Sequence, residues 1–179
     1  MIPIIIPNYN QITYLKNAIN WWRWYSDGEI YVVDNGSDSQ ELMNYYDYLT
    51  QVNHARVELY GENDFISNMT DIVSRISTEK YVISDPDIMP HPNTPPNFLE
   101  VFEYCIDSGF HHVGFDLITD IPDWNDQREW VIGNEKLAGE SIYPVQFNDV
   151  EYIGRKAAID TTFAMYSNKN SGWHQPIRS

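Results

Sequence analysis

The sequence predicts an α/β fold with a mixed, mostly parallel central sheet flanked by helices. Two observations lead to this prediction: short apolar runs alternate with segments of helical periodicity, and polar residues gather directly after several of the apolar runs. Such alternation indicates parallel strands joined by crossover helices, and in these sheets ligands bind beyond the carboxyl ends of the strands. A chain of 179 residues with 42% hydrophobic content is expected to form one domain, 1–179.

The first half of the chain is expected to contain three strand–helix units and a fourth strand. The continuous apolar stretch over 2–6, which ends at Pro7, is typical of a strand buried on both faces. Ser39 is well placed to cap the second helix. The expected strands cover 2–6, 30–33, 57–60 and the run that begins at 81, and the expected helices cover 13–25, the segment after Ser39, and 67–77.

The second half is less regular. A loop rich in proline over 89–96 separates it from the acidic end of the fourth strand. Residues 118–156 are weakly periodic and are predicted to be mostly loop. The expected elements are a helix over 98–106, strands over 112–117, 143–147 and 152–153, and an extended segment over 159–166.

Charge and composition exclude several classes of function. A formal net charge of −15 argues against a nucleic acid or an anionic membrane as partner, because both require clustered Lys and Arg. No apolar run approaches the length of a membrane span, and the first residues lack the basic region and cleavage site of a secretory signal, so a cytoplasmic protein is expected. Cys105 is the single cysteine, which predicts a packed helix thiol and excludes an internal disulfide.

The strongest functional clue is the segment 81–87, in which an apolar run ends in two carboxylates, Asp85 and Asp87. In an extended segment, residues two apart project to the same face, so these carboxylates are predicted to share one divalent cation, Mg²⁺ or Mn²⁺. The pattern Asp-x-Asp arises about once by chance in a chain this rich in Asp, and a solvated acidic turn or helix cap is the alternative. The position between a buried strand and a proline-rich loop favours the metal site.

Two further strand ends carry polar clusters, at 7–10 (Pro-Asn-Tyr-Asn) and at 34–38 (Asp-Asn-Gly-Ser-Asp). Neither Gly-x-Gly-x-x-Gly nor Gly-x-x-x-x-Gly-Lys-Ser/Thr follows the first strand, which disfavours a dinucleotide dehydrogenase and a P-loop NTPase. Because the chain is strongly acidic, any phosphate ligand requires a metal ion as mediator.

These strand ends resemble those of the nucleotide-sugar-dependent glycosyltransferases of the A-type (GT-A) fold, especially the large family 2 group. The first strand of that family ends in Pro-x-Tyr-Asn, as at Pro7, Tyr9 and Asn10, and its second strand ends in Val-Asp-Asn/Asp-Gly-Ser-x-Asp, as at 33–38. The matches cover about the first 90 residues in the family's order, which makes them more specific than any single motif. The resemblance implies a GT-A type, Rossmann-like nucleotide-binding fold.

The resemblance also implies a metal-dependent donor site. Asp85 and Asp87 are expected to hold Mn²⁺ or Mg²⁺ between the two phosphates of a nucleoside diphosphate sugar, with a UDP-sugar preferred. A third metal ligand, which many GT-A enzymes supply from a His near the end of the domain, is expected at His174. The implied contacts to the nucleotide are Pro7, Tyr9, Asn10, Asp34 at the base or ribose, the spaced asparagines Asn63 and Asn68, and Asp85.

The downstream resemblance is weaker. The segments 115–117 and 159–163 are similar to small glycosyltransferase domains, some of them virus-encoded. An inverting enzyme needs a carboxylate that takes the proton of the acceptor hydroxyl. Asp160 is the hypothesis for this base, with Asp116 and Asp149 as rivals, and a structural role for Asp160 is equally open.

The expected function is transfer of a sugar from the nucleotide to a carbohydrate hydroxyl. Trp124 and Trp130 are candidates for a platform that binds the acceptor, with core anchoring as the alternative. A non-catalytic sugar-binding or degenerate transferase domain is the second interpretation. A sugar nucleotidyltransferase is less favoured, because the Gly-rich, basic first loop that such enzymes need is missing. The chain is either a whole catalytic domain or the N-terminal part of a longer protein.

Overall fold

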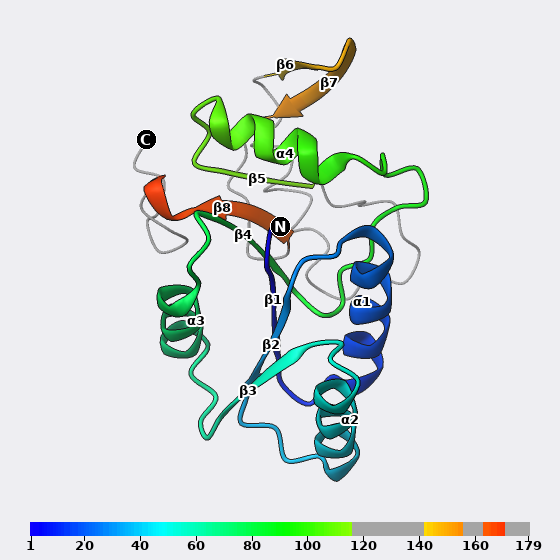
Figure 1. Cartoon of the computed structure of the whole chain (residues 1–179), viewed down its shortest axis with the longest axis vertical. Coiled ribbons are helices and arrows are strands. Elements are labelled where there is room, and N and C mark those ends of the chain that lie inside the picture. The colour runs from blue at the N-terminus through cyan, green and yellow to red at the C-terminus, as the bar shows by residue number, and fades with distance from the viewer. Residues whose placement is uncertain (116–141, 156–162, 171–179) are drawn as a thin grey trace, which may run out of the picture.

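Six strands form the central sheet of the computed structural model, which describes residues 1–115, 142–155 and 163–170 (Figure 1). They are β1 (Ile4–Asn8), β2 (Ile30–Asn35), β3 (Arg56–Tyr60), β4 (Lys80–Ser84), β5 (His112–Gly114) and β8 (Phe163–Ser167). Their order across the sheet is β3–β2–β1–β4–β8–β5. β1 is parallel to β2 and β4, β2 is parallel to β3, and β8 is antiparallel to β4 and β5. The sheet is therefore mixed and mostly parallel, as the sequence predicts.

Helices cover both faces of this sheet. In the described residues they are α1 (Ile12–Tyr25), α2 (Gln40–Gln51), α3 (Phe65–Arg75) and α4 (Phe98–Asp107), with a short 3-10 helix, η1 (Asn168–Asn170), after β8. Figure 1 shows α1 and α2 on one side of the sheet and α3 on the other. A separate antiparallel hairpin, β6 (Ile142–Phe147) and β7 (Val150–Arg155), lies beyond α4. None of the described helices has the length and apolar character needed to span a bilayer.

Successive residues of the central strands bury opposite faces of the sheet, as strand geometry requires. Ile4 and Ile6 of β1 pack in the cluster that contains the apolar residues of α1, α2 and α4, whereas Ile5 packs in the cluster that contains those of α3. All three side chains are 0% exposed. Burial on both faces explains why the sequence of β1 is a continuous apolar run.

An aromatic cluster joins α1 and α4 to β8. The Trp22 ring stacks on Phe163 with 5.1 Å between ring centroids, and Phe98 lies 6.1 Å from the same ring. Cys105 is buried on α4, and this burial raises the pKa of its thiol, so the predicted packed helix thiol is confirmed. These contacts hold the late strand β8 against the first helix of the chain.

Most predicted elements are confirmed within a few residues of their expected boundaries. Ser39 caps α2 as expected, since its Oγ accepts a hydrogen bond from the N–H of Leu42 at 3.4 Å. The extended segment predicted over 159–166 is observed as β8 from Phe163 onward, and 116–141, 156–162 and 171–179 lie outside the described residues. The insertion of β8 between β4 and β5 was not predicted, because a sequence of alternating elements does not specify which strands pair.

The turn between α1 and β2 passes very close to the start of the chain. A Cβ atom on Gly28 would lie 2.1 Å from the backbone oxygen of Ile2, and Ile4 N–H donates to the carbonyl of Glu29 at 2.8 Å. The Gly28 carbonyl also accepts from Arg23 Nη1 at 2.8 Å. A side chain at position 28 would therefore collide with the backbone at Ile2, and one of the two segments would have to move.

We predict that Gly28→Ala lowers the free energy of unfolding by about 1–3 kcal/mol, the usual cost of overpacking. Gly61→Ala is the matched control, because no atom lies within 4 Å of a Cβ placed on Gly61. Urea denaturation of both variants measures the difference. Equal stability of the two variants would show that the chain start moves without cost.

Candidate functional site

The candidate site lies where β1, β2 and β4 end. β1 is flanked by β2 on one side and β4 on the other, so the strand order reverses direction at β1. In open α/β sheets, ligands bind beyond the carboxyl ends of the strands at such a reversal. The sequence-predicted residues at 7–10, 34–38 and 85–87 lie at or directly after these strand ends.

Asp34 is a buried carboxylate at the end of β2. Its side chain is 2% exposed. Oδ1 accepts a hydrogen bond from the hydroxyl of Tyr46 at 2.6 Å, and Oδ2 accepts from the backbone N–H of Ser37 at 2.9 Å. Both oxygens are thus engaged within the protein, and the second bond closes the turn that follows β2.

Tyr46 connects this carboxylate to the end of β1. The Asn8 Nδ2 group donates to the Tyr46 hydroxyl at 2.8 Å, and Asn8 is 2% exposed. Burial raises the pKa of Tyr46, and its hydrogen bond to Asp34 raises it further, so the hydroxyl keeps its proton. We refer to Asn8, Tyr46 and Asp34 as the Tyr46 relay. No sequence signal marks this relay, because Tyr46 has the spacing of one more apolar residue on the buried side of α2, with Leu42 and Leu49.

Hydrogen bonds from backbone N–H groups to side-chain oxygens join the loops after β1 and β2. The N–H of Asn10 donates to Ser37 Oγ at 2.9 Å, and the N–H of Asp38 donates to Asn10 Oδ1 at 3.1 Å. Asn10 has a φ of 55°, in the left-handed region that Asn tolerates better than most residues. Pro7 is buried, whereas Tyr9 is 47% exposed and presents its ring at the surface. Of the predicted nucleotide contacts at and after the end of β1, Tyr9 and Asn10 are therefore accessible to a ligand.

The two predicted asparagines of the third unit differ in their surroundings. Asn68 is 7% exposed, and its Nδ2 donates to Asn35 Oδ1 at 2.7 Å and to the Glu62 carbonyl at 3.1 Å. Asn68 thus ties α3 to the end of β2. Asn63 lies in the exposed loop before α3.

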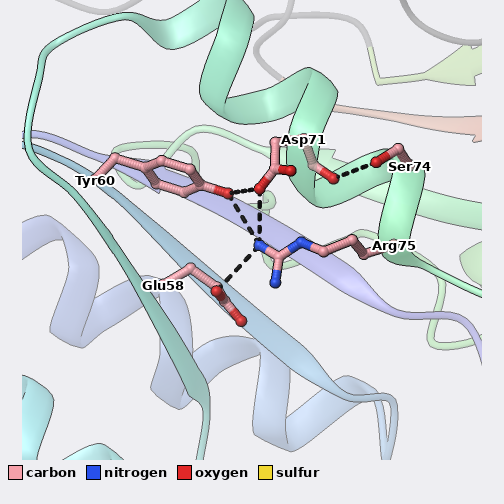
Figure 2. A network of polar contacts seen from close by, with 5 residues as sticks. All are labelled: Glu58, Tyr60, Asp71, Ser74 and Arg75. Carbon is pink, nitrogen blue, oxygen red and sulfur yellow. Dashed lines mark hydrogen bonds and ion pairs between the residues drawn. The ribbon is translucent and has the colours of Figure 1, made fainter.

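A second polar network fixes α3 to the edge strand β3. Figure 2 shows Arg75 between three partners: its Nη2 lies 3.1 Å from Glu58 Oε2, 3.0 Å from Asp71 Oδ2 and 3.0 Å from the Tyr60 hydroxyl. A hydrogen bond from Tyr60 lowers the pKa of Asp71, and the hydrogen bond to Glu58 raises the pKa of Arg75. The exposed network adds little stability on its own, and it links β3 to α3, the helix that carries Asn68.

The predicted metal-binding pair lies just beyond β4. The N–H of Ile88 donates to the carbonyl of Asp85 at 3.3 Å, so Asp85 and Asp87 belong to a turn. The extended conformation assumed for this pair is wrong, and strand periodicity does not set the direction of its side chains. Asp85 is half-buried and Asp87 is exposed. Both remain within three residues of the carboxyl end of a central strand, where a ligand is expected.

The donor set suits a hard cation. Carboxylate oxygens are the preferred ligands of Mg²⁺ and Mn²⁺, which usually complete their coordination with water and substrate phosphate oxygens. Within the described residues there is no group of three or more His, Cys, Asp or Glu side chains that could hold a metal. Asp116, Asp160 and His174, together with Trp124 and Trp130, lie outside the described residues and stay predictions.

Comparison with family models and with curated proteins finds no significant match. Among solved structures, the mannosyltransferase PcManGT from Pyrobaculum calidifontis, in complex with GDP-Man and Mn²⁺, is similar at a TM-score of 0.57 and 14% sequence identity. The similarity covers 94% of this chain and 44% of the mannosyltransferase, so the chain spans less than half the length of that protein. CMP:2-keto-3-deoxy-manno-octonic acid synthetase complexed with CTP has a TM-score of 0.49 and 8% identity, over 95% of this chain and 76% of that one.

The likeness to the mannosyltransferase establishes the fold class. The protein has a GT-A type, Rossmann-like α/β fold, with its polar strand ends gathered at one edge of the sheet. The fold predicted from the resemblance is therefore confirmed.

The buried asparagine and its exposed neighbour permit a direct test of the site's construction. We predict that Asn68→Ala lowers the free energy of unfolding by about 1–3 kcal/mol, because it leaves Asn35 Oδ1 and the Glu62 carbonyl without their donor. Asn63→Ala should change it by no more than about 0.5 kcal/mol, as is usual for exposed positions. Urea denaturation measures both values, and equal effects would contradict the structural role of Asn68.

Proposed function

We propose that this protein is a metal-dependent glycosyltransferase that moves a sugar from a nucleoside diphosphate sugar, preferably a UDP-sugar, to a carbohydrate hydroxyl. The observation that carries the proposal is the position of Asp85 and Asp87 at the end of β4, next to β1 with its accessible Tyr9 and Asn10. The mannosyltransferase of similar fold was solved with GDP-Man and Mn²⁺, which supports a nucleotide sugar and a divalent cation as ligands.

The distribution of basic residues supports the need for a metal. The loops that directly follow β1, β2 and β4, at 9–11, 36–39 and 85–97, contain no Lys or Arg. Every Lys and Arg whose side chain the structure describes has a partner elsewhere: Lys16 with Glu41, Arg23 with the carbonyls of Gly28 and His54, Arg56 with Glu29, Arg75 with Glu58, Lys80 with Glu103 and Asp107, and Lys169 with Glu79. A diphosphate at these strand ends would therefore depend on a cation held by the carboxylates.

In this proposal the chain's residues bind and orient the donor. Asp85 and Asp87 hold the cation, which when bound stabilises the charge on the departing diphosphate as a Lewis acid. The exposed ring of Tyr9 offers a face on which the nucleotide base stacks. The hydrogen bond between Asn10 and Ser37 joins the loop after β1, which contains Tyr9, to the loop after β2, which follows Asp34.

Strand register supports the proposed catalytic carboxylates. Phe163, the first residue of β8, pairs with Ser84, the last residue of β4, and Gly114 at the end of β5 pairs with Ala164. The chain therefore enters β8 and leaves β5 at the same edge of the sheet as the Asp-x-Asp turn. Asp160 precedes Phe163 by three residues, which span at most about 11 Å, and Asp116 follows Gly114 by two.

The structure gives the rival Asp149 a weaker claim. It lies in the turn between β6 and β7 with an exposed side chain. Figure 1 places this hairpin on the far side of α4 from the ends of β1 and β2. We therefore keep Asp160 as the proposed base and Asp116 as its alternative.

We predict that UDP binds the wild type in the presence of Mn²⁺ and not in the presence of a chelator. Asp87→Ala should weaken Mn²⁺-dependent binding by roughly 100-fold or more, because loss of a ligand exceeds the 10- to 100-fold effect typical of outer-shell changes. Isothermal titration calorimetry measures both affinities. Asp47→Ala, which removes an exposed carboxylate from α2, is the matched control and should bind like the wild type.

Two results would count against the proposal. Equal UDP affinity with Mn²⁺ and with chelator would remove the metal from the donor site. No binding of UDP or GDP under any condition would favour a degenerate or non-catalytic domain.

A further inference from the structure

The Tyr46 relay contains a buried polar atom that the fold itself does not use. Among the described residues, no hydrogen-bond donor lies within reach of Asn8 Oδ1, although this atom is closed to solvent. A buried acceptor without a donor costs stability, and such groups are rare in folded proteins. An atom of this kind at the carboxyl end of β1 is where a ligand's N–H group would find an acceptor.

The hydrogen-bond chemistry of the relay explains why the carboxamide takes this orientation. The Asp34 carboxylate only accepts hydrogen bonds, so the single proton of the Tyr46 hydroxyl is directed to it. The hydroxyl oxygen is then left as an acceptor, and of the two ends of the Asn8 carboxamide only Nδ2 can donate to it. The charge of Asp34 thereby determines that Oδ1 is the atom of Asn8 that has no hydrogen-bond partner among the described residues.

The packing of the Tyr46 ring does not by itself require a hydroxyl group. Tyr46 is 3% exposed and belongs to the same core cluster as Leu42 and Leu49, its neighbours on the buried side of α2. A phenylalanine would fill the same space without a polar atom. Asn8 and Asp34 are register partners on β1 and β2, so the hydroxyl reaches both from a third element.

We propose that Tyr46 is a positioning residue of the nucleotide site: through Asp34 it orients Asn8 so that Oδ1 accepts a hydrogen bond from an N–H group of the nucleobase. This inference rests on the proposed function, because it assigns the base half of the same donor. Uracil and guanine both present a ring N–H donor suited to such an acceptor. Because Oδ1 is closed to solvent, a ligand reaches it only if the groups that cover this atom move.

The test separates the base half of the ligand from the diphosphate half. UDP, GDP and inorganic pyrophosphate are titrated with Mn²⁺ into the wild type, Tyr46→Phe and Tyr48→Phe by calorimetry. Tyr46→Phe should weaken binding of the nucleotide that the wild type prefers by about tenfold, the loss expected for a hydrogen-bond network to a charged group. Its affinity for pyrophosphate, which has no base, should stay within about twofold. Tyr48→Phe, an exposed position on the same helix, should change neither.

A double-mutant cycle with Asn8→Ala tests whether the two residues act through each other. If they do, the double variant binds the nucleotide no more weakly than either single variant. Thermal unfolding of each variant confirms that the fold is retained.

Each remaining outcome is decisive. Equal loss of nucleotide and pyrophosphate affinity in Tyr46→Phe, or no loss, overturns the positioning role while the donor site stands. Additive losses in the cycle overturn the link through Asn8. A wild type that binds pyrophosphate with Mn²⁺ but neither nucleotide overturns the inference, and a wild type that binds none of the three overturns the proposed function with it.

Discussion

The buried carboxylate of Asp34 is the constraint on which the candidate site depends. A charge that is 2% exposed is tolerated only when donors surround it. The Tyr46 hydroxyl and the Ser37 N–H supply them from α2 and from the turn after β2. Ser37 in turn accepts from Asn10, which follows β1. One buried charge therefore fixes two loops and a helix relative to two strands, and Tyr9, next to Asn10, is held at the surface as a result.

This construction separates structural acids from acids that are free to meet a ligand. Asp34 is enclosed and accepts one internal hydrogen bond at each oxygen, whereas Asp87 is exposed and lies in a loop without Lys or Arg. In a chain of net charge −15, an anionic ligand is repelled unless positive charge is brought to the site. The basic side chains that the structure describes are engaged with other partners. The same acidity that argues against a nucleic-acid partner also means that the proposed nucleotide would need a cation as mediator.

The sequence predicted the parts of the fold that depend on local pattern. The apolar run of β1, the helical spacing of α1 and the Ser39 cap each follow from interactions between near neighbours, and each is confirmed. The Tyr46 relay joins residues 12 and 38 positions apart, so no local pattern contains it. The conformation at Asp85 was predicted wrongly for a related reason. The strand ends at Ser84, and the hydrogen bond from Ile88 to the Asp85 carbonyl forms a turn that the alternation of the strand does not indicate. The predicted contact of Asn68 with a nucleotide stays a prediction, and the sequence did not indicate that its amide nitrogen donates to Asn35 and to the Glu62 carbonyl.

The antiparallel strand β8 explains how both halves of the chain reach one edge of the sheet. Parallel strands all end at the same edge of a sheet, and an antiparallel neighbour begins there. Because Phe163 pairs with Ser84 and Ala164 pairs with Gly114, the late part of the chain returns to the edge at which β1, β2 and β4 end. A parallel strand at this position would have started at the opposite edge, away from the Asp-x-Asp turn. The mixed sheet therefore brings the second half of the chain to the edge at which the candidate site lies.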